Sequence, residues 1–203
     1  MTTVDSHVGN ETVQDAPLDL CEKSASINMN KNAGFPAVIL LDNQGGYRMK
    51  GNEKVIEHLN LRLAEELTAI NQYMVHSEMC DNWGYERLHK MIEKRAIDEM
   101  KHAEKLIARI LFLDGRPIVS NLNKVYIGAE VPKMHESDRA AEEGAIRGYN
   151  ESIRLAVEVG DNGTRELLEA ILKDEEDHID LLEAQLDQIK QMGIQNYLVE
   201  QLG

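Results

Sequence analysis

The stretch IDEMKHAE at residues 97–104 decides the fold, because KDEEDHID at residues 173–180 repeats its Asp-Glu-x-x-His motif 76 positions later. The same interval separates Glu66 from Glu142. Each half of the chain therefore contains a lone glutamate followed by a Glu-x-x-His pair. In a four-helix bundle, one glutamate from each of two helices and one Glu-x-x-His from each of the other two surround a dinuclear metal site. We predict such a bundle and such a site.

The composition favours a single helical domain. Of the 203 residues, 42% are hydrophobic but only 4% are aromatic, which disfavours a β-rich core. The two cysteines, Cys21 and Cys80, form no C-x-x-C pair, so the chain encodes no thiolate zinc site, rubredoxin-type iron site or disulfide framework. A reducing compartment suits such a chain. Because we find neither a membrane-spanning apolar run nor a signal peptide, we expect a cytoplasmic protein.

The charge of the chain restricts its partners. The formal net charge is −14, whereas phosphate binding relies on clustered Lys and Arg, so nucleic acid is disfavoured as a partner. Cations are more compatible with this charge, although an acidic surface also serves solubility alone. We expect neither nucleic acid nor membrane among the partners.

Four long helices are expected, because apolar residues recur at intervals of three and four from residue 52 onward. The first begins near residue 52, the second covers about 84–113, the third runs from about 132 or 137 to 159, and the fourth runs from Thr164, as N-cap, to 193. Residues 114–131 are too long for a hairpin and form a crossover between the two helix pairs. Residues 194–202 form a short fifth helix that either caps the bundle or meets another subunit. The expected fold is therefore all-α.

The first 48 residues differ from the rest of the chain. They show no helical period, so we predict a disordered N-terminal extension that precedes one domain at residues 49–203. Gly45 and Gly46 lie just before Met49, and glycine codons at this place can supply a ribosome-binding sequence. The natural start is therefore either Met49, with residues 1–48 upstream of it, or Met1, with the extension as a flexible arm.

Six side chains on the inward seams of the helices are the expected metal ligands: Glu66, Glu99, His102, Glu142, Glu175 and His178. Buried carboxylates are unfavourable unless their charge is neutralised. Four carboxylates balance two divalent cations, and two neutral imidazoles complete the site without adding charge. Such a ligand set suits iron first and manganese second, rather than structural zinc. Its open coordination positions can accept O₂ or peroxide, which predicts redox chemistry.

Other polar residues have two interpretations each. Tyr73 and Tyr149 lie two turns from the lone glutamates, so each either hydrogen-bonds a ligand or donates an electron, or only fills the core. Asp98 and Asp174 either orient a ligand or lie on the surface. The pair at residues 86–89, Glu-x-x-His, has no counterpart 76 positions later, so it should face solvent. Three further histidines are expected to be ordinary helix residues: His58, His76 and His135.

The domain at residues 49–203 resembles the bacterioferritins, which are haem-containing members of the ferritin-like superfamily. The start of that family coincides with Met49. The matching motifs are long, and they include MKG at 49–51, AINQY at 69–73, NWG at 82–84, IDEMKHAE at 97–104, DEE and HID within 174–180, and QNYL at 195–198.

The resemblance implies roles for these residues. It makes Glu99 and Glu175 the bridging carboxylates of a di-iron centre, Glu66 and Glu142 the terminal ones, and His102 and His178 the imidazole ligands. It also implies that Met100 binds a haem b shared between two subunits. The family further implies a hollow homo-oligomer of 24 subunits, built from haem-bridged dimers, that stores a ferric mineral. An electron-donating protein such as a ferredoxin would then reduce the stored iron through the haem.

One residue departs from the family pattern. Some members carry a His and an acid at an additional inner-surface iron site, whereas this chain has Lys94 with Asp98. A protonated lysine cannot serve as a ligand, which puts that site in doubt.

Together these features predict an iron-storage ferroxidase that oxidises Fe²⁺ with O₂ or H₂O₂. One alternative is a rubrerythrin-like, peroxide-scavenging di-iron protein, which the absence of paired cysteines disfavours. The other is a haem-binding structural subunit of a mixed cage, which the complete set of six ligands disfavours.

Overall fold

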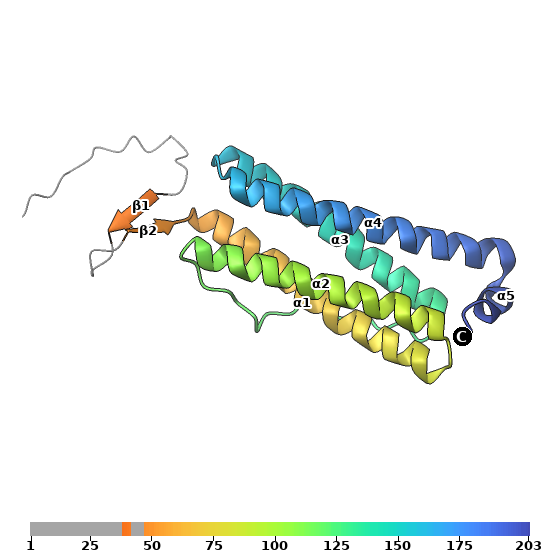
Figure 1. Ribbon diagram of the computed structural model, residues 1–203. Coiled ribbons are helices and arrows are strands. Elements are labelled where there is room, and N and C mark those ends of the chain that lie inside the picture. The colour runs from red at the N-terminus through yellow and green to blue at the C-terminus, as the bar shows by residue number, and fades with distance from the viewer. Residues whose placement is uncertain (1–37, 42–46) are drawn as a thin grey trace, which may run out of the picture. The chain divides into compact units, whose positions relative to one another are not determined.

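The computed structural model describes residues 38–41 and 47–203. Five helices follow a short pair of strands (Figure 1): α1 at Glu53–Asn82, α2 at Glu86–Phe112, α3 at Val131–Glu158, α4 at Asn162–Met192 and α5 at Ile194–Val199. Helix α1 packs along α2, and α3 packs along α4, as the two hairpins of a four-helix bundle. The prediction of an all-α bundle with a long crossover and a short fifth helix is confirmed. None of the helices among the described residues is both long and apolar enough to cross a membrane.

The helix ends follow local capping. The side chain of Asn52 accepts a hydrogen bond from the Lys54 amide at 2.9 Å and starts α1. The prediction of Thr164 as the N-cap of α4 is wrong, because Asp161 occupies that position and accepts a hydrogen bond from the Thr164 amide at 3.0 Å. Aspartate is the better cap because its charge also complements the positive end of the helix dipole.

Two short strands precede the bundle. Strand β1 at Val38–Leu41 pairs antiparallel with β2 at Tyr47–Lys50, so that Val38 lies opposite Lys50. No regular structure was predicted before residue 49, so this hairpin differs from the prediction. Its four-residue strands are too short for an alternation pattern to be diagnostic. Residues 1–37 and 42–46 lie outside the described residues, and the division into an extension and a domain stays a prediction.

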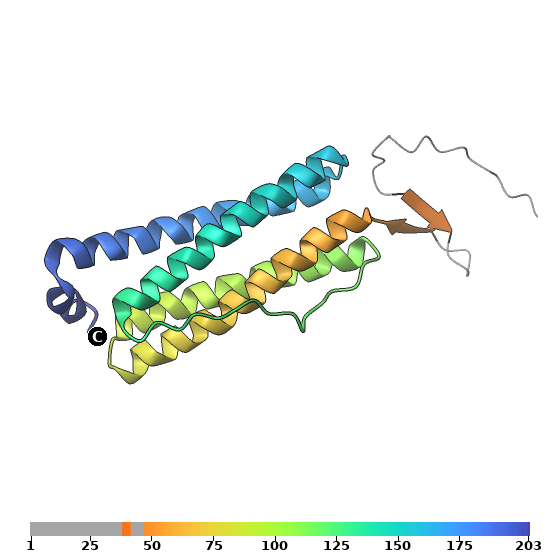
Figure 2. The same ribbon diagram turned by 180° about the vertical axis from the view of Figure 1, so that it is seen from behind.

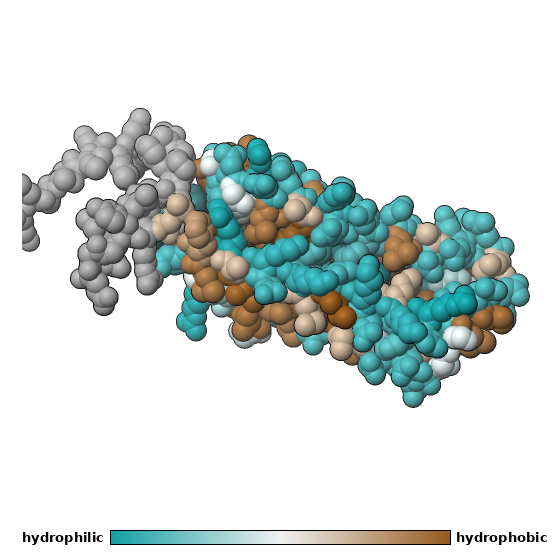
Figure 3. Space-filling view, viewed as in Figure 1, coloured by the Kyte–Doolittle hydropathy of each residue, from teal (hydrophilic) through white to brown (hydrophobic). Residues whose placement is uncertain are grey.

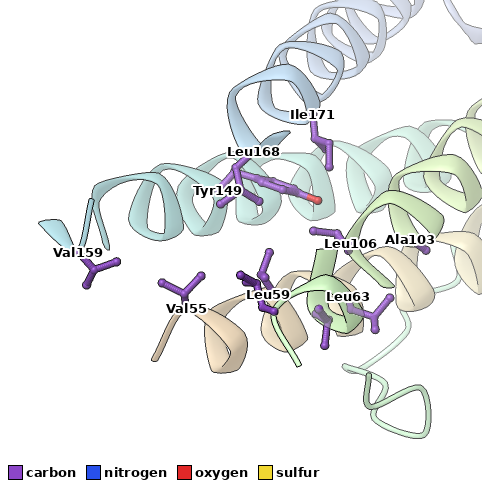
Figure 4. Packing of buried hydrophobic residues seen from close by; sticks show 11 residues of the cluster. Val55, Leu59, Leu63, Ala103, Leu106, Tyr149, Val159, Leu168 and Ile171 are labelled. Atoms are coloured by element: carbon purple, nitrogen blue, oxygen red, sulfur yellow. The ribbon is translucent and has the colours of Figure 1, made fainter. Parts of the chain in front are cut away.

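Two apolar clusters hold the bundle together. The first joins residues from all four long helices, among them Leu59, Leu63, Leu106, Leu168 and Ile171 (Figure 4). The second lies toward the other end of the bundle and includes Leu88, Ile92, Met134 and Tyr197. Each fully buried Leu or Ile contributes about 1.5–3 kcal/mol of hydrophobic stabilisation. Because the predicted metal ligands lie between the two clusters along the helices, apolar packing on both sides positions them.

Helix α5 caps the end of the bundle. Gly193, at φ 79°, supplies the left-handed turn between α4 and α5. The hydroxyl of the buried Tyr197 then donates a hydrogen bond to Gln185 Oε1 at 2.8 Å and lies 3.1 Å from His135 Nε2. Of the two predicted roles for this segment, the described structure therefore favours capping.

The crossover, residues 113–130, is extended and runs along α1 (Figure 2). Four of its backbone amides donate to side chains of α1: Ile118 to Asn60 Oδ1 at 2.7 Å, Asn123 to Thr68 Oγ1 at 2.8 Å, Tyr126 to Gln72 Oε1 at 2.9 Å and Gly128 to His76 Nε2 at 3.0 Å. The acceptors are separated by four or eight residues, so one face of α1 binds the crossover.

Gly128→Ala should destabilise the protein by about 1–3 kcal/mol, because a Cβ there would lie 2.3 Å from the Met134 nitrogen, which is backbone that cannot rotate away. Gly144→Ala is the matched control, since a Cβ at Gly144 meets nothing within 4 Å, and alanine favours the helix by about 0.5–1 kcal/mol. Urea unfolding followed by circular dichroism measures both. Equal stability of the two variants would contradict the close approach at Gly128.

Candidate metal centre

The six predicted ligands come together in the middle of the bundle. Two groups of side chains each offer ligand atoms that lie within 4.8 Å of one another. One group is Glu66, Glu99, His102 and Glu175, and the other is Glu99, Glu142, Glu175 and His178. Glu99 and Glu175 belong to both groups. The arrangement therefore has two overlapping positions for a cation, with two carboxylates between them.

The imidazoles face these shared carboxylates. His102 Nδ1 lies 2.9 Å from Glu99 Oε2 and 3.0 Å from Glu175 Oε1. His178 Nδ1 lies 3.1 Å from Glu99 Oε1 and 3.4 Å from Glu175 Oε2. Five of the six ligand side chains are buried, and His178 is partly exposed.

Several buried atoms at the centre lack a hydrogen-bond partner within the protein: Glu99 Oε1, Glu175 Oε1 and His178 Nδ1. Buried polar atoms are normally satisfied, so an unsatisfied group of carboxylate oxygens and an imidazole nitrogen calls for a cation. Carboxylate and imidazole donors suit iron or manganese. The residues present therefore fit a pair of such ions.

Protons replace cations when no metal is bound. Burial, together with the charges of Glu175 and Glu99, raises the pKa of Glu66 well above its ordinary value. Burial opposes charge on His178, but the nearby carboxylates of Glu175 and Glu99 raise its pKa to about 10. Burial also opposes charge on His102, but the carboxylates of Glu175, Glu66 and Glu99 around it outweigh this effect and raise its pKa. At neutral pH both imidazoles of the metal-free site are therefore protonated on both ring nitrogens and carry a positive charge.

Metal affinity should consequently rise with pH. An imidazole whose pKa is raised stays protonated below that pKa, and it must lose this proton before its Nδ1 can bind a cation. Between pH 6 and 8, binding of two Co²⁺ ions should release at least about two protons per subunit, one from each histidine. Calorimetric titrations in buffers with different heats of ionisation measure this number. His178→Ala should lower it by about one, and a release near zero would contradict the protonated imidazoles.

Neighbouring side chains hold the ligands. Tyr73 donates a hydrogen bond to Glu142 Oε1 at 2.7 Å, and Tyr149 donates to Glu66, so each tyrosine binds the lone glutamate of the other half. The hydrogen-bonding interpretation of both tyrosines is therefore confirmed. His102 Nε2 lies 3.1 Å from Asp174 Oδ2, so Asp174 can orient this imidazole.

Two cavities reach the centre from different sides. A cavity of about 550 Å³ lies between α1, α3 and the crossover, and all four ligand glutamates line it. A second cavity of about 230 Å³ lies between α2 and α4 and is lined by both ligand histidines and by Lys94, Lys101 and Lys105. The outer face over α2 and α4 is mainly hydrophilic, with small hydrophobic patches (Figure 3). The candidate ligands therefore line cavities on two sides of the bundle.

Comparisons with known proteins agree with this geometry. Residues 56–192 match the family model described as the ferritin-like domain. The chain is 42% identical over 149 residues to the bacterioferritin of Rhodobacter capsulatus, an alignment that covers 73% of this chain and 92% of the relative. It is 44% identical over 150 residues to the bacterioferritin of Streptomyces coelicolor, with 74% and 90% covered. This chain is a member of the ferritin-like family. Both of these relatives are bacterioferritins.

Some residues that were predicted to lie outside the centre are exposed, and others are partly buried. Glu86 is exposed, as predicted, and it forms an ion pair with Lys90. His89 differs from the prediction, because it is partly buried and its Nδ1 lies 2.9 Å from Ser77 Oγ. Asp98 pairs with Lys101 at 2.8 Å and with Lys94 at 3.8 Å, so it stays on the surface side of the second cavity.

Sequence reasoning missed a polar cluster beside the centre. His76, expected to be an ordinary helix residue, is fully buried, and its Nδ1 lies 2.8 Å from Asp138 Oδ1. Gln72 donates to the same oxygen at 2.9 Å, and Arg95 binds Asp138 Oδ2. The available signal was that Arg95 lies four residues before Glu99, on the same inward seam.

Met100, the residue predicted to bind haem, lies on the surface of the subunit. It is 53% exposed on α2, and the neighbouring Ile97 is 42% exposed. A haem bound between two subunits requires a ligand atom that is accessible from outside one subunit, and the Met100 thioether meets this requirement. The donor therefore fits haem iron.

Proposed function

We propose that this protein stores iron and is a ferroxidase. Two Fe²⁺ ions, as substrates, bind among the six ligands and are oxidised together by O₂ or H₂O₂. The observation that supports this proposal is the sharing of Glu99 and Glu175 by both ligand groups. Two Fe²⁺ release two electrons, which is enough to reduce O₂ to hydrogen peroxide or hydrogen peroxide to water. Ferric product is then deposited as a mineral inside a hollow oligomer.

The protein groups bind the substrate and prepare the site for it. Four carboxylates neutralise two divalent cations, and the imidazoles give up their protons as the ions bind. Tyr73 and Tyr149 hold the terminal carboxylates by hydrogen bonds, and Asp174 orients His102. The long helices hold these groups in one geometry, so little rearrangement is needed when iron binds.

The test is an anaerobic Fe²⁺ titration of the full chain followed by aeration, with absorbance recorded in the ferric-oxo region. We expect about two Fe²⁺ per subunit to oxidise in a fast phase, well ahead of iron in buffer alone. Oxidation no faster than in buffer would reject the ferroxidase. Further additions of Fe²⁺ should then build a mineral, whereas a peroxide scavenger of the rubrerythrin type would turn over without storing iron.

The assembly and its location belong to the same proposal. The resemblance to the bacterioferritins implies a homo-oligomer of 24 subunits built from haem-bridged dimers, and an electron donor such as a ferredoxin. Haem b would supply a one-electron centre for the release of stored iron. The free, buried Cys80 suits a cytoplasmic location. Mass measurement of the native assembly tests the subunit number, and it also distinguishes a pure cage from a mixed one.

Met100→Leu should abolish haem binding and leave Fe²⁺ oxidation unchanged. Leucine has a similar volume but no sulfur, and the exposed side chain contributes little to the core. Haem absorbance per subunit after reconstitution is the measurement. The control is Met192→Leu, which changes an exposed methionine on α4 and should leave haem binding unchanged. Full haem binding by Met100→Leu would reject Met100 as the ligand.

A further inference from the structure

The 76-residue repeat that relates the two halves of the centre fails beside the ligands. Four residues of the first half that lie at the centre have identical counterparts in the second: Glu66, Tyr73, Glu99 and His102. Arg95, however, has Ile171 as its counterpart, and Asp138 has Arg62. The two cation positions therefore have equivalent ligands but different charges around them.

On the Glu142 side, a buried guanidinium lies against the ligand. Arg95 is 3% exposed, and its Nε lies 3.8 Å from Glu142 Oε1. Its Cζ lies 4.2 Å from the ring centre of Tyr73, whose hydroxyl binds the same carboxylate. Arg95 Nη2 binds Asp138, but Nε and Nη1 have no hydrogen-bond acceptor. Asp138 thus compensates the far side of the guanidinium, while the near side faces Glu142.

On the Glu66 side, no guanidinium contacts the ligand. Among the ion pairs of the described residues, Glu66 pairs only with His102, at 3.6 Å. The buried Arg62 lies farther from this side, because its Cζ is 6.0 Å from the ring centre of Tyr149 and its Nε lies 2.7 Å from Glu65 Oε2. The position equivalent to Arg95 is the apolar, fully buried Ile171.

A buried positive charge next to a carboxylate weakens the attraction of that carboxylate for a divalent cation, and the effect is large where water is excluded. We propose that the Glu142–His178 position binds its divalent cation more weakly than the Glu66–His102 position, so that the two ions bind in a fixed order. Arg95 is the positioning residue that sets this order, acting through Glu142. The inference rests on the proposed di-iron site and adds a binding sequence to it.

An anaerobic calorimetric titration with Co²⁺, which is not oxidised by this procedure, tests the order on the full chain. In the wild type we expect two binding steps whose affinities differ by at least about tenfold. His102→Ala should remove the tight step and His178→Ala the weak one. Arg95→Met/Asp138→Asn, which removes both charges of the pair, should bring the two affinities to within about threefold.

Two further variants separate charge from general damage. Arg109→Met/Asp161→Asn makes the same exchange in another ion pair, in which Arg109 Nη2 on α2 lies 2.6 Å from Oδ1 of Asp161, the N-cap of α4. This variant should keep both Co²⁺-binding steps. Asparagine also keeps the cap of α4. Asp138→Asn alone unmasks the Arg95 charge and should widen the separation, so the inference remains testable if the double variant does not fold.

The outcomes distinguish the two proposals. Fewer than about two Co²⁺ per subunit in the wild type would reject the dinuclear site itself. Two ions of equal affinity, or two steps that stay unchanged in both Asp138 variants, would overturn the role of Arg95 and leave the dinuclear site standing. Merged steps in the Arg109 control as well would also overturn it, because the effect would then be general.

Discussion

Glu99→Ala should lower the rate of the fast phase of Fe²⁺ oxidation by at least about 100-fold. Loss of a side chain that only supports a metal ligand commonly costs 10–100-fold, and Glu99 contributes to both cation positions. Its removal leaves two cations to share three carboxylates, so the second ion lacks both a ligand and charge compensation. Stopped-flow absorbance after mixing anaerobic Fe²⁺-loaded protein with O₂ gives the rate.

Glu104→Ala is the matched control for this substitution. Glu104 lies on the same helix, five residues farther along, and is exposed. It should keep the wild-type rate. The metal-free Glu99→Ala protein should remain folded, because the Glu175 carboxylate still lies 3.0 Å from His102 Nδ1 and 3.4 Å from His178 Nδ1 and compensates their charge. A variant that folds and still oxidises iron at half the wild-type rate would show that Glu99 does not bridge the substrate ions.

Asp138→Ala should destabilise the protein by about 3–5 kcal/mol, because breaking a buried ion pair leaves its partner charged and without compensation. Asp138 lies on α3, is fully buried and accepts hydrogen bonds from Gln72 on α1 and Arg95 on α2. Its loss therefore removes contacts that join α3 to both of these helices. His76 loses its partner as well. The free energy of unfolding in urea, at a fixed protein concentration, measures the effect.

The control for Asp138→Ala is Glu143→Ala on the same helix. Glu143 forms an exposed ion pair with Arg147 at 2.8 Å, and such pairs contribute between 0 and about 1 kcal/mol. A loss below about 1 kcal/mol for Asp138→Ala would mean that water replaces the lost carboxylate and that the cluster is not closed to solvent.

Much of this fold was accessible from local patterns. Apolar residues at intervals of three and four indicated the four long helices, and proline, glycine and asparagine indicated the crossover. The errors were at the ends of elements, where Asp161 rather than Thr164 caps α4, and in the hairpin of β1 and β2. Such features depend on single residues or on pairing between strands, and periodicity does not report either one.

The sequence by itself determined which six side chains are the candidate ligands, because a motif repeated at a constant interval places like side chains at like positions of a symmetric bundle. Only the tertiary structure decided what surrounds those ligands. Arg95 and Asp138 are 43 positions apart, and Gln72 and Asp138 are 66 apart, so no local pattern links them. Whether a charged residue on an inward seam finds a partner depends on which helices pack together. That packing makes two repeated halves chemically unequal, because it buries a guanidinium beside Glu142 and an isoleucine at the equivalent position.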